Sequence, residues 1–151
     1  MISQLTRYIS TQLATALLII ALSLTAIVWL TQALRFIDFI VNRGVSAFTF
    51  VKMTGLMIPS LLFVVLPLAV FISVLFVYHR LSQDSELVVL RAAGQSRRQL
   101  ARPVWLVAGI AMLFSYFVSF YLMPVTYHKF KEMQSFLRDN YASLLLQEEV
   151  Y

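Results

Sequence analysis

The sequence has no cysteine and little charge: Asp, Glu, Lys and Arg together make up 13% of its 151 residues. The missing thiols exclude a disulfide scaffold and any zinc or iron–sulfur site built on cysteine. Soluble domains carry about 25% charged and about 45–50% apolar residues, whereas 60% of this chain is hydrophobic. This composition excludes an ordinary soluble domain and a disordered chain. Twelve phenylalanines beside only four glycines and four prolines suit a helical protein embedded in lipid.

Long uncharged runs account for most of the hydrophobic residues. With His79 counted as neutral, they are Tyr8–Leu34, Met53–His79 and Pro103–His128. Each exceeds the about 20 apolar residues that a bilayer-spanning helix requires. Consecutive hydrophobic residues within them, as at Leu17–Leu22, do not alternate with polar ones as a membrane β-barrel would demand. The runs therefore predict an all-α membrane protein with three transmembrane helices.

The first run has an alternative interpretation as a cleaved signal peptide, since Arg7 precedes it. The apolar core of a signal peptide is only about 7–15 residues long, and Tyr8–Leu34 is far longer. No Ala-x-Ala cleavage site follows promptly. We therefore favour a retained transmembrane helix.

A cluster of arginines lies between the second and third runs. It comprises Arg80, Arg91, Arg97, Arg98 and Arg102, against the acidic residues Asp84 and Glu86. Because loops on the cytoplasmic side are enriched in Lys and Arg, this segment is predicted to be cytoplasmic. The N-terminus is then cytoplasmic, and the chain after the third run lies outside.

The segment predicted to face outward, residues 35–52, carries cations as well. Arg35, Arg43 and Lys52 stand there against a single acidic residue, Asp38. This excess is smaller than that of the cytoplasmic segment, so the predicted orientation is unchanged. The outward cations nevertheless require an explanation of their own.

The cytoplasmic segment begins with the pattern of a short helix, over about residues 83–94. Asp84 and Glu86 stand where such a helix would begin, and negative charge there complements the helix dipole. Leu87, Leu90 and Ala93 recur at three-residue spacing and form an apolar stripe. A short amphipathic helix near the membrane surface is therefore expected.

The end of this helix also has sequence signals. Gly94 is typical of the position just past a helix C-terminus. Ser96-Arg-Arg-Gln99 matches a capping box, so a second helix is predicted to begin there. The pattern alone leaves two interpretations open: a solvated turn at the membrane interface, or a docking helix for a cytoplasmic partner.

Three stretches resemble the LptF/LptG permease family, the inner-membrane subunits of the lipopolysaccharide export ABC transporter of Gram-negative bacteria. They are Arg7-Tyr8, Leu66-Pro67-Leu68 and Asp84-Ser-Glu-Leu-Val-Val-Leu-Arg-Ala-Ala-Gly-Gln-Ser96. The resemblance covers about residues 7–147 and looks more like the LptF member. It implies a multi-pass location in the bacterial inner membrane.

The resemblance implies that the short helix is a coupling helix, seated in a groove of a cytoplasmic ATPase. Glu86 matches the family's carboxylate that pairs with an arginine of that ATPase. The implied coupling residues are Asp84, Glu86, Leu87, Leu90, Arg91 and Gly94.

The resemblance also supplies a reason for the outward cations. Arg35 matches a family cation at the outer end of the first span, and Arg43 and Lys52 are nearby candidates. Lipid A carries phosphates, which guanidinium binds through forked, charge-assisted hydrogen bonds. The alternative is that Arg35 merely snorkels to the membrane interface.

The implied partners are a cytoplasmic ABC ATPase dimer (LptB-like), a paralogous permease subunit, an LptC-like periplasmic or membrane partner, lipopolysaccharide and membrane lipids. Nucleic acid is not expected. The sequence has no Gly-rich phosphate loop, so ATP hydrolysis belongs to the ATPase. The three runs lack Asp and Glu, and neither His79 nor His128 has a second ligand at metal spacing. We therefore expect no catalytic residue, metal or cofactor.

The family has six spans, with a periplasmic β-jelly-roll domain between the third and fourth. This sequence stops at Tyr151, roughly where that domain would begin. We expect an N-terminal transmembrane half, without the jelly roll and the second three-span half, and transport by this half alone is doubtful. Two other functions stay open: a different ABC-type mechanotransmission protein, or a membrane scaffold that does not transport.

Overall fold

The computed structural model describes the backbone of residues 2–148, with their side chains except at positions 2, 3, 39, 43 and 148. The elements in chain order are α1 (Ile2–Arg43), α2 (Ala47–Gly55), α3 (Ile58–Gln83), α4 (Glu86–Ala92), α5 (Arg97–Phe117), the π-helical turn η1 (Val118–Leu122) and α6 (Met123–Glu148). Over this described range there is no strand, so the all-α prediction is confirmed.

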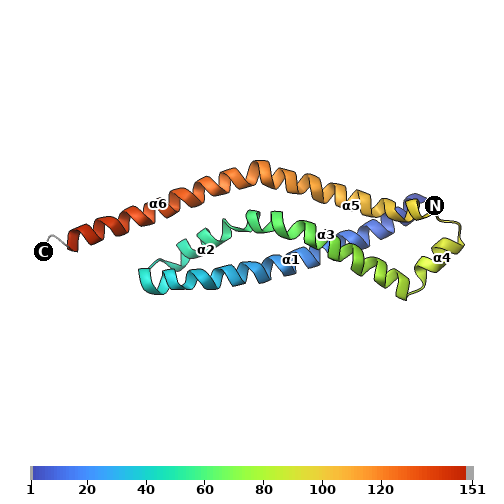
Figure 1. The fold of residues 1–151 in the computed structure, drawn as a ribbon, viewed down its shortest axis with the longest axis horizontal. Coiled ribbons are helices and arrows are strands. Elements are labelled where there is room, and N and C mark those ends of the chain that lie inside the picture. Colours follow the sequence, from blue (N-terminus) through green and yellow to red (C-terminus); the bar gives the residue numbers. More distant parts are fainter. Residues whose placement is uncertain (1, 149–151) are drawn as a thin grey trace.

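Within residues 2–148, three helical segments are long and apolar enough to cross a membrane: Gln4–Asn42, Ile58–Gln83 and Arg97–Gln147. Figure 1 shows the N-terminal end of α1 and helix α4 at one end of the molecule, and the α1–α2 turn and the end of α6 toward the other. Three successive crossings produce this arrangement. Large apolar side chains cover the outside, with Leu18, Phe71 and Leu113 exposed by 63%, 63% and 71%. Such a surface suits lipid rather than water.

The second crossing begins later than the sequence indicates. Met53 belongs to α2, and the chain turns at Leu56 and Met57 before α3 starts at Ile58. Pro59 therefore lies in the first turn of α3, where a missing N–H removes no intrahelical bond. Pro67, by contrast, lies inside α3 and interrupts its hydrogen-bond ladder.

The segment predicted as an outward loop is mostly helical. Helix α1 continues through Arg35 to Arg43, and α2 contains Lys52. The indole Nε1 of Trp29 in α1 donates a hydrogen bond to the carbonyl oxygen of Thr54 in α2 at 3.2 Å. This contact holds α2 against α1.

The buried core lies where α1, α3 and α5 meet near α4. Its centre is the cluster Ile9, Leu13, Val77, Leu81 and Val107. Helix α3 also buries small residues on the same face, and Ala69 and Ser73 are both 0% exposed. Small side chains let membrane helices approach closely, and packing rather than hydrophobic transfer holds such helices together.

The third crossing is one long rod with a defect in its middle. In η1 the N–H of Met123 bonds to the carbonyl of Val118, five residues back. Pro124 follows immediately and has no N–H to donate. A π-turn at this point accommodates the proline without ending the helix.

Candidate coupling helix and phosphate-binding cations

Helix α4 is set off from α3 by one unusual residue. Asp84 closes α3: its N–H bonds to the carbonyl of Arg80 at 3.0 Å, and its carboxylate lies 3.8 Å from the guanidinium of the same arginine. Ser85 then adopts a left-handed conformation with φ 58°, and Glu86 is the first residue of α4. Asp84 thus ends one helix instead of starting the next, whereas Glu86 opens α4 as predicted.

The C-terminus of α4 is closed by a Schellman motif. The N–H of Gly94 bonds to the carbonyl of Arg91 at 3.0 Å, and the N–H of Gln95 bonds to the carbonyl of Leu90 at 3.1 Å. Gly94 has φ 86°, a conformation that glycine adopts without strain. The predicted helix-ending role of Gly94 is confirmed.

A short connection, residues 93–96, leads from α4 to α5, and Ser96 is the N-cap residue of α5. The Ser96 hydroxyl accepts a hydrogen bond from the N–H of Gln99 at 3.3 Å, and the Gln99 side chain accepts one from the N–H of Ser96 at 2.9 Å. This reciprocal pair is the predicted capping box, and it is confirmed. Because the connection is short and both of the helix ends that it joins are capped, we infer that α4 and α5 form a stiff corner.

The side chains of α4 divide between two faces. Leu87 and Leu90 are half-buried, and Leu87 packs against the core cluster. Val88 and Val89 point away and are each 65% exposed. An exposed apolar face of this kind suits contact with another protein or with the membrane.

Sequence reasoning placed Leu87 and Leu90 among the coupling residues and did not single out the exposed Val88 and Val89. A signal was present, since Val88 and Ala92 are four residues apart and so share a second apolar face of the same short helix. A helix that is apolar on two sides has two sets of neighbours.

The charges on α4 are free to meet a partner. Glu86 is partly exposed and Arg91 exposed, and neither forms an ion pair within the described part of the chain. The Arg80–Asp84 pair is largely exposed, with side chains 65% and 57% accessible. Exposed pairs of this kind contribute about 0–1 kcal/mol.

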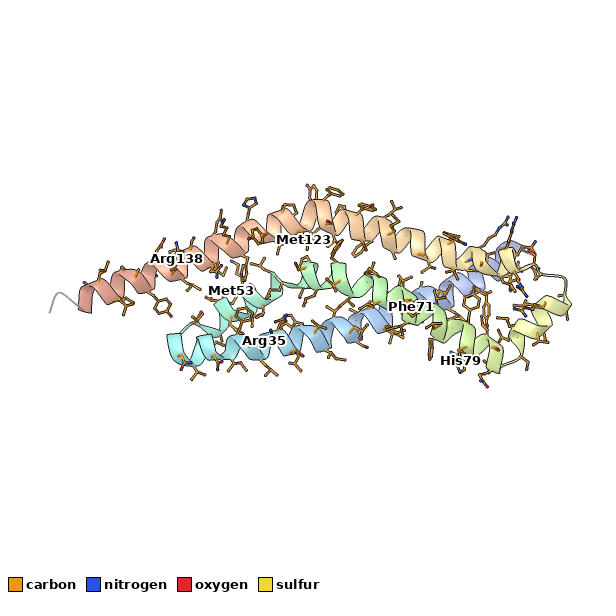
Figure 2. All side chains as sticks on the ribbon, viewed as in Figure 1. Arg35, Met53, Phe71, His79, Met123 and Arg138 are labelled. Atoms are coloured by element: carbon orange, nitrogen blue, oxygen red, sulfur yellow. The ribbon has the colours of Figure 1, made fainter. Side chains whose placement is uncertain are left out.

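The candidate phosphate-binding cations lie in the half of the molecule away from α4 (Figure 2). Arg35 and Lys52 are both exposed, and in Figure 2 Arg35 lies on α1 in the same half of the molecule as Met53 on α2. The side chain of Arg43, the third predicted residue, lies outside the described residues. Among the described side chains, Arg35 has no ion-pair partner within reach, Asp38 included. Lys52 also complements the C-terminal dipole of α2, which is a purely structural role.

An apolar cavity of about 670 Å³ lies further along this half of the molecule. It is enclosed by the α2–α3 turn and the start of α6, including Met57, Pro59, Met123 and Tyr127. Its walls suit an acyl chain better than a charged group. No group of three or more His, Asp or Glu in the part of the chain described could hold a metal ion.

Three long apolar helices, with a short capped helix between the second and the third, define a multi-pass α-helical membrane protein. Residues 7–151 match the family model of the lipopolysaccharide export system permease LptF/LptG, and the chain belongs to this family. The resemblance inferred from the sequence is confirmed. Family and apolar helices together make it a multi-pass inner-membrane protein of a transporter-permease family, not of an enzyme family.

The chain is also similar to an uncharacterized protein of Rickettsia prowazekii (strain Madrid E). The two are 31% identical over 145 residues, which cover 96% of this chain and 40% of the relative. The chain thus spans well under half the length of that curated relative.

Proposed function

We propose that this chain is the N-terminal membrane part of a permease that extracts lipopolysaccharide from the inner membrane for export to the outer membrane. A separate cytoplasmic ATPase dimer supplies the work, and a paralogous permease subunit and an LptC-like partner complete the transporter. The observation that carries the proposal is the exposed apolar face of α4, rigidly joined to a transmembrane helix.

The first step is docking of α4 on the ATPase. Val88 and Val89 bury their exposed surface in a groove of that partner, and Glu86 pairs with an arginine there. Partial burial strengthens such a pair relative to a surface one. Orientation follows the arginine-rich segment, with α4 and the N-terminus in the cytoplasm and the end of α6 in the periplasm.

The second step is transmission of the ATPase movement. Only residues 93–96 connect α4 to α5, and the Schellman motif and the capping box constrain both ends of this connection. A displacement of α4 therefore moves α5, and through the core cluster it also moves α1 and α3. A stiff corner is what a lever requires.

The third step is contact with the lipid. Arg35 and Lys52, with Arg43 as the further candidate, stand at the periplasmic end and bind the phosphates of lipid A. Forked guanidinium–phosphate hydrogen bonds give this role to arginine in particular. Acyl chains lie against the apolar helix surfaces below.

Glu86→Ala tests the docking role in the full-length permease complex. It should weaken co-purification of the ATPase, or leave ATP hydrolysis uncoupled from lipopolysaccharide release. Glu132→Ala removes one exposed carboxylate from α6 and is the matched control. If Glu86→Ala left both the association with the ATPase and the coupling of ATP hydrolysis to lipopolysaccharide release unchanged, the result would support a membrane scaffold instead.

Arg35→Lys and Arg35→Ala test the lipid contact. A photo-crosslinker near the end of α1 should capture less lipopolysaccharide in both variants, because lysine keeps the charge but loses the fork. If Arg35 only snorkels, the lysine variant should crosslink as well as the unsubstituted protein.

A further inference from the structure

A groove of about 460 Å³ lies between α3, α4 and α5, on the side of α4 that faces the bundle. Two arginines line it, Arg91 from α4 and Arg97 from the first turn of α5. Arg91 itself is exposed and lies one helical turn from Val88, on the flank of α4 that Leu87 shares. It therefore borders both the groove and the exposed apolar face of α4.

The positive charge of this groove is uncompensated. No carboxylate contributes to its described wall. Asp84 is engaged with Arg80, and neither Arg91 nor Arg97 has an acidic partner among the described residues. Arg97 also stands at the N-terminus of α5, whose dipole disfavours a cation. Two like charges converging in this way are stabilised by an anion between them.

Apart from Tyr78, whose hydroxyl is bonded to the Leu100 carbonyl, the rest of the groove is apolar. Val74, Leu87, Leu100 and Val104 form its walls, and Trp105 is 78% exposed at its edge. Tryptophan prefers the boundary between hydrocarbon and headgroups. The groove therefore offers cations at headgroup level and an apolar slot running into the membrane, which matches one lipid molecule better than a soluble anion.

We propose that this groove binds an anionic phospholipid of the cytoplasmic leaflet. Its phosphate bridges Arg91 of α4 and Arg97 of α5, and one acyl chain lies along Val104 and Trp105. Anionic lipids are concentrated in that leaflet and attract juxtamembrane arginines. Helix α4 buries no side chain completely, so a lipid that joins α4 to α5 from beneath stiffens the corner that the ATPase drives. The leaflet assignment rests on the orientation in the proposed function.

The test is photo-crosslinking in the full-length permease complex, reconstituted in phosphatidylcholine vesicles that contain a minority of phosphatidylglycerol. A photoreactive amino acid replaces Val104, which lines the groove. Phosphatidylglycerol should be captured in preference to phosphatidylcholine. About 1 kcal/mol per cation near an anionic membrane corresponds to about fivefold in binding, so Arg97→Ala should lower the phosphatidylglycerol adduct about fivefold.

Arg98→Ala is the matched control, since Arg98 is an exposed arginine of the same turn that does not line the groove. Its adduct should stay unchanged. Equal capture of both lipids, equal loss in Arg98→Ala, or capture of protein in place of lipid would each overturn the proposal. The orientation is tested separately with Ser82→Cys. If a membrane-impermeant thiol reagent modified this cysteine from outside, the proposed function would fail on its orientation, whatever the result of the lipid crosslinking.

Discussion

The hydroxyl of Tyr78 in α3 donates a hydrogen bond to the backbone carbonyl of Leu100 in α5. The bond joins two of the three apolar rods beside the core cluster, where α4 connects to both of them. It is the side-chain hydrogen bond that holds the α3–α4–α5 corner together from within.

Tyr78→Phe should remove this bond and keep the ring. Because interhelical hydrogen bonds in membrane proteins contribute about 0.6 to 1.5 kcal/mol, unfolding in mixed micelles should become easier by about that amount. Tyr116→Phe is the control, since Tyr116 is 51% exposed and its ring stack with Phe120 is kept. Equal effects of the two substitutions would show that the Tyr78 bond contributes nothing.

Leu13→Ala should destabilise the bundle strongly. Leu13 is 0% exposed in the core cluster, and emptying such a site costs about 2–5 kcal/mol. Leu18→Ala deletes the same atoms from a side chain that is 63% exposed and should change stability by only about 0.5 kcal/mol. Thermal unfolding of the two purified variants in detergent compares them directly. Similar unfolding midpoints would contradict the assignment of Leu13 to the packed core.

Gly94→Ala should loosen the stiff corner. Nothing lies within 4 Å of a Cβ at this position, so the penalty comes from the positive φ alone, at about 1–2 kcal/mol. Coupling of ATP hydrolysis to lipid release should fall with stability. Gly109→Ala, inside α5 with equally open surroundings, should be neutral or stabilising by up to about 1 kcal/mol. If Gly94→Ala matched Gly109→Ala in stability and in coupling, the claim that transport requires a rigid corner would be contradicted.

Local signals predicted much of the corner correctly. Gly94 and the Ser96–Gln99 pair act through backbone hydrogen bonds within a few residues, so their roles follow from spacing alone. The uncharged runs likewise located the crossings, because a bilayer imposes a minimum apolar length.

Features that depend on neighbours in space escaped prediction. The break between α2 and α3 falls inside an uncharged run, where hydropathy carries no signal for it, and it lies beside the contact between the distant residues Trp29 and Thr54. The outward position of Val88 and Val89 emerges only once Leu87 is seen packed on the core. The roles of Arg35 and Lys52 in phosphate binding and of Glu86 in ATPase coupling remain predictions.

The most direct test of the account is labelling of a single cysteine at Val89 in the full-length permease, since the described chain contributes no cysteine of its own. A membrane-impermeant thiol reagent should modify it in inside-out vesicles stripped of the ATPase, and should fail to do so when the ATPase is bound. Labelling in right-side-out vesicles, or equal labelling with and without the ATPase, would contradict the claim that α4 is the cytoplasmic lever of this permease.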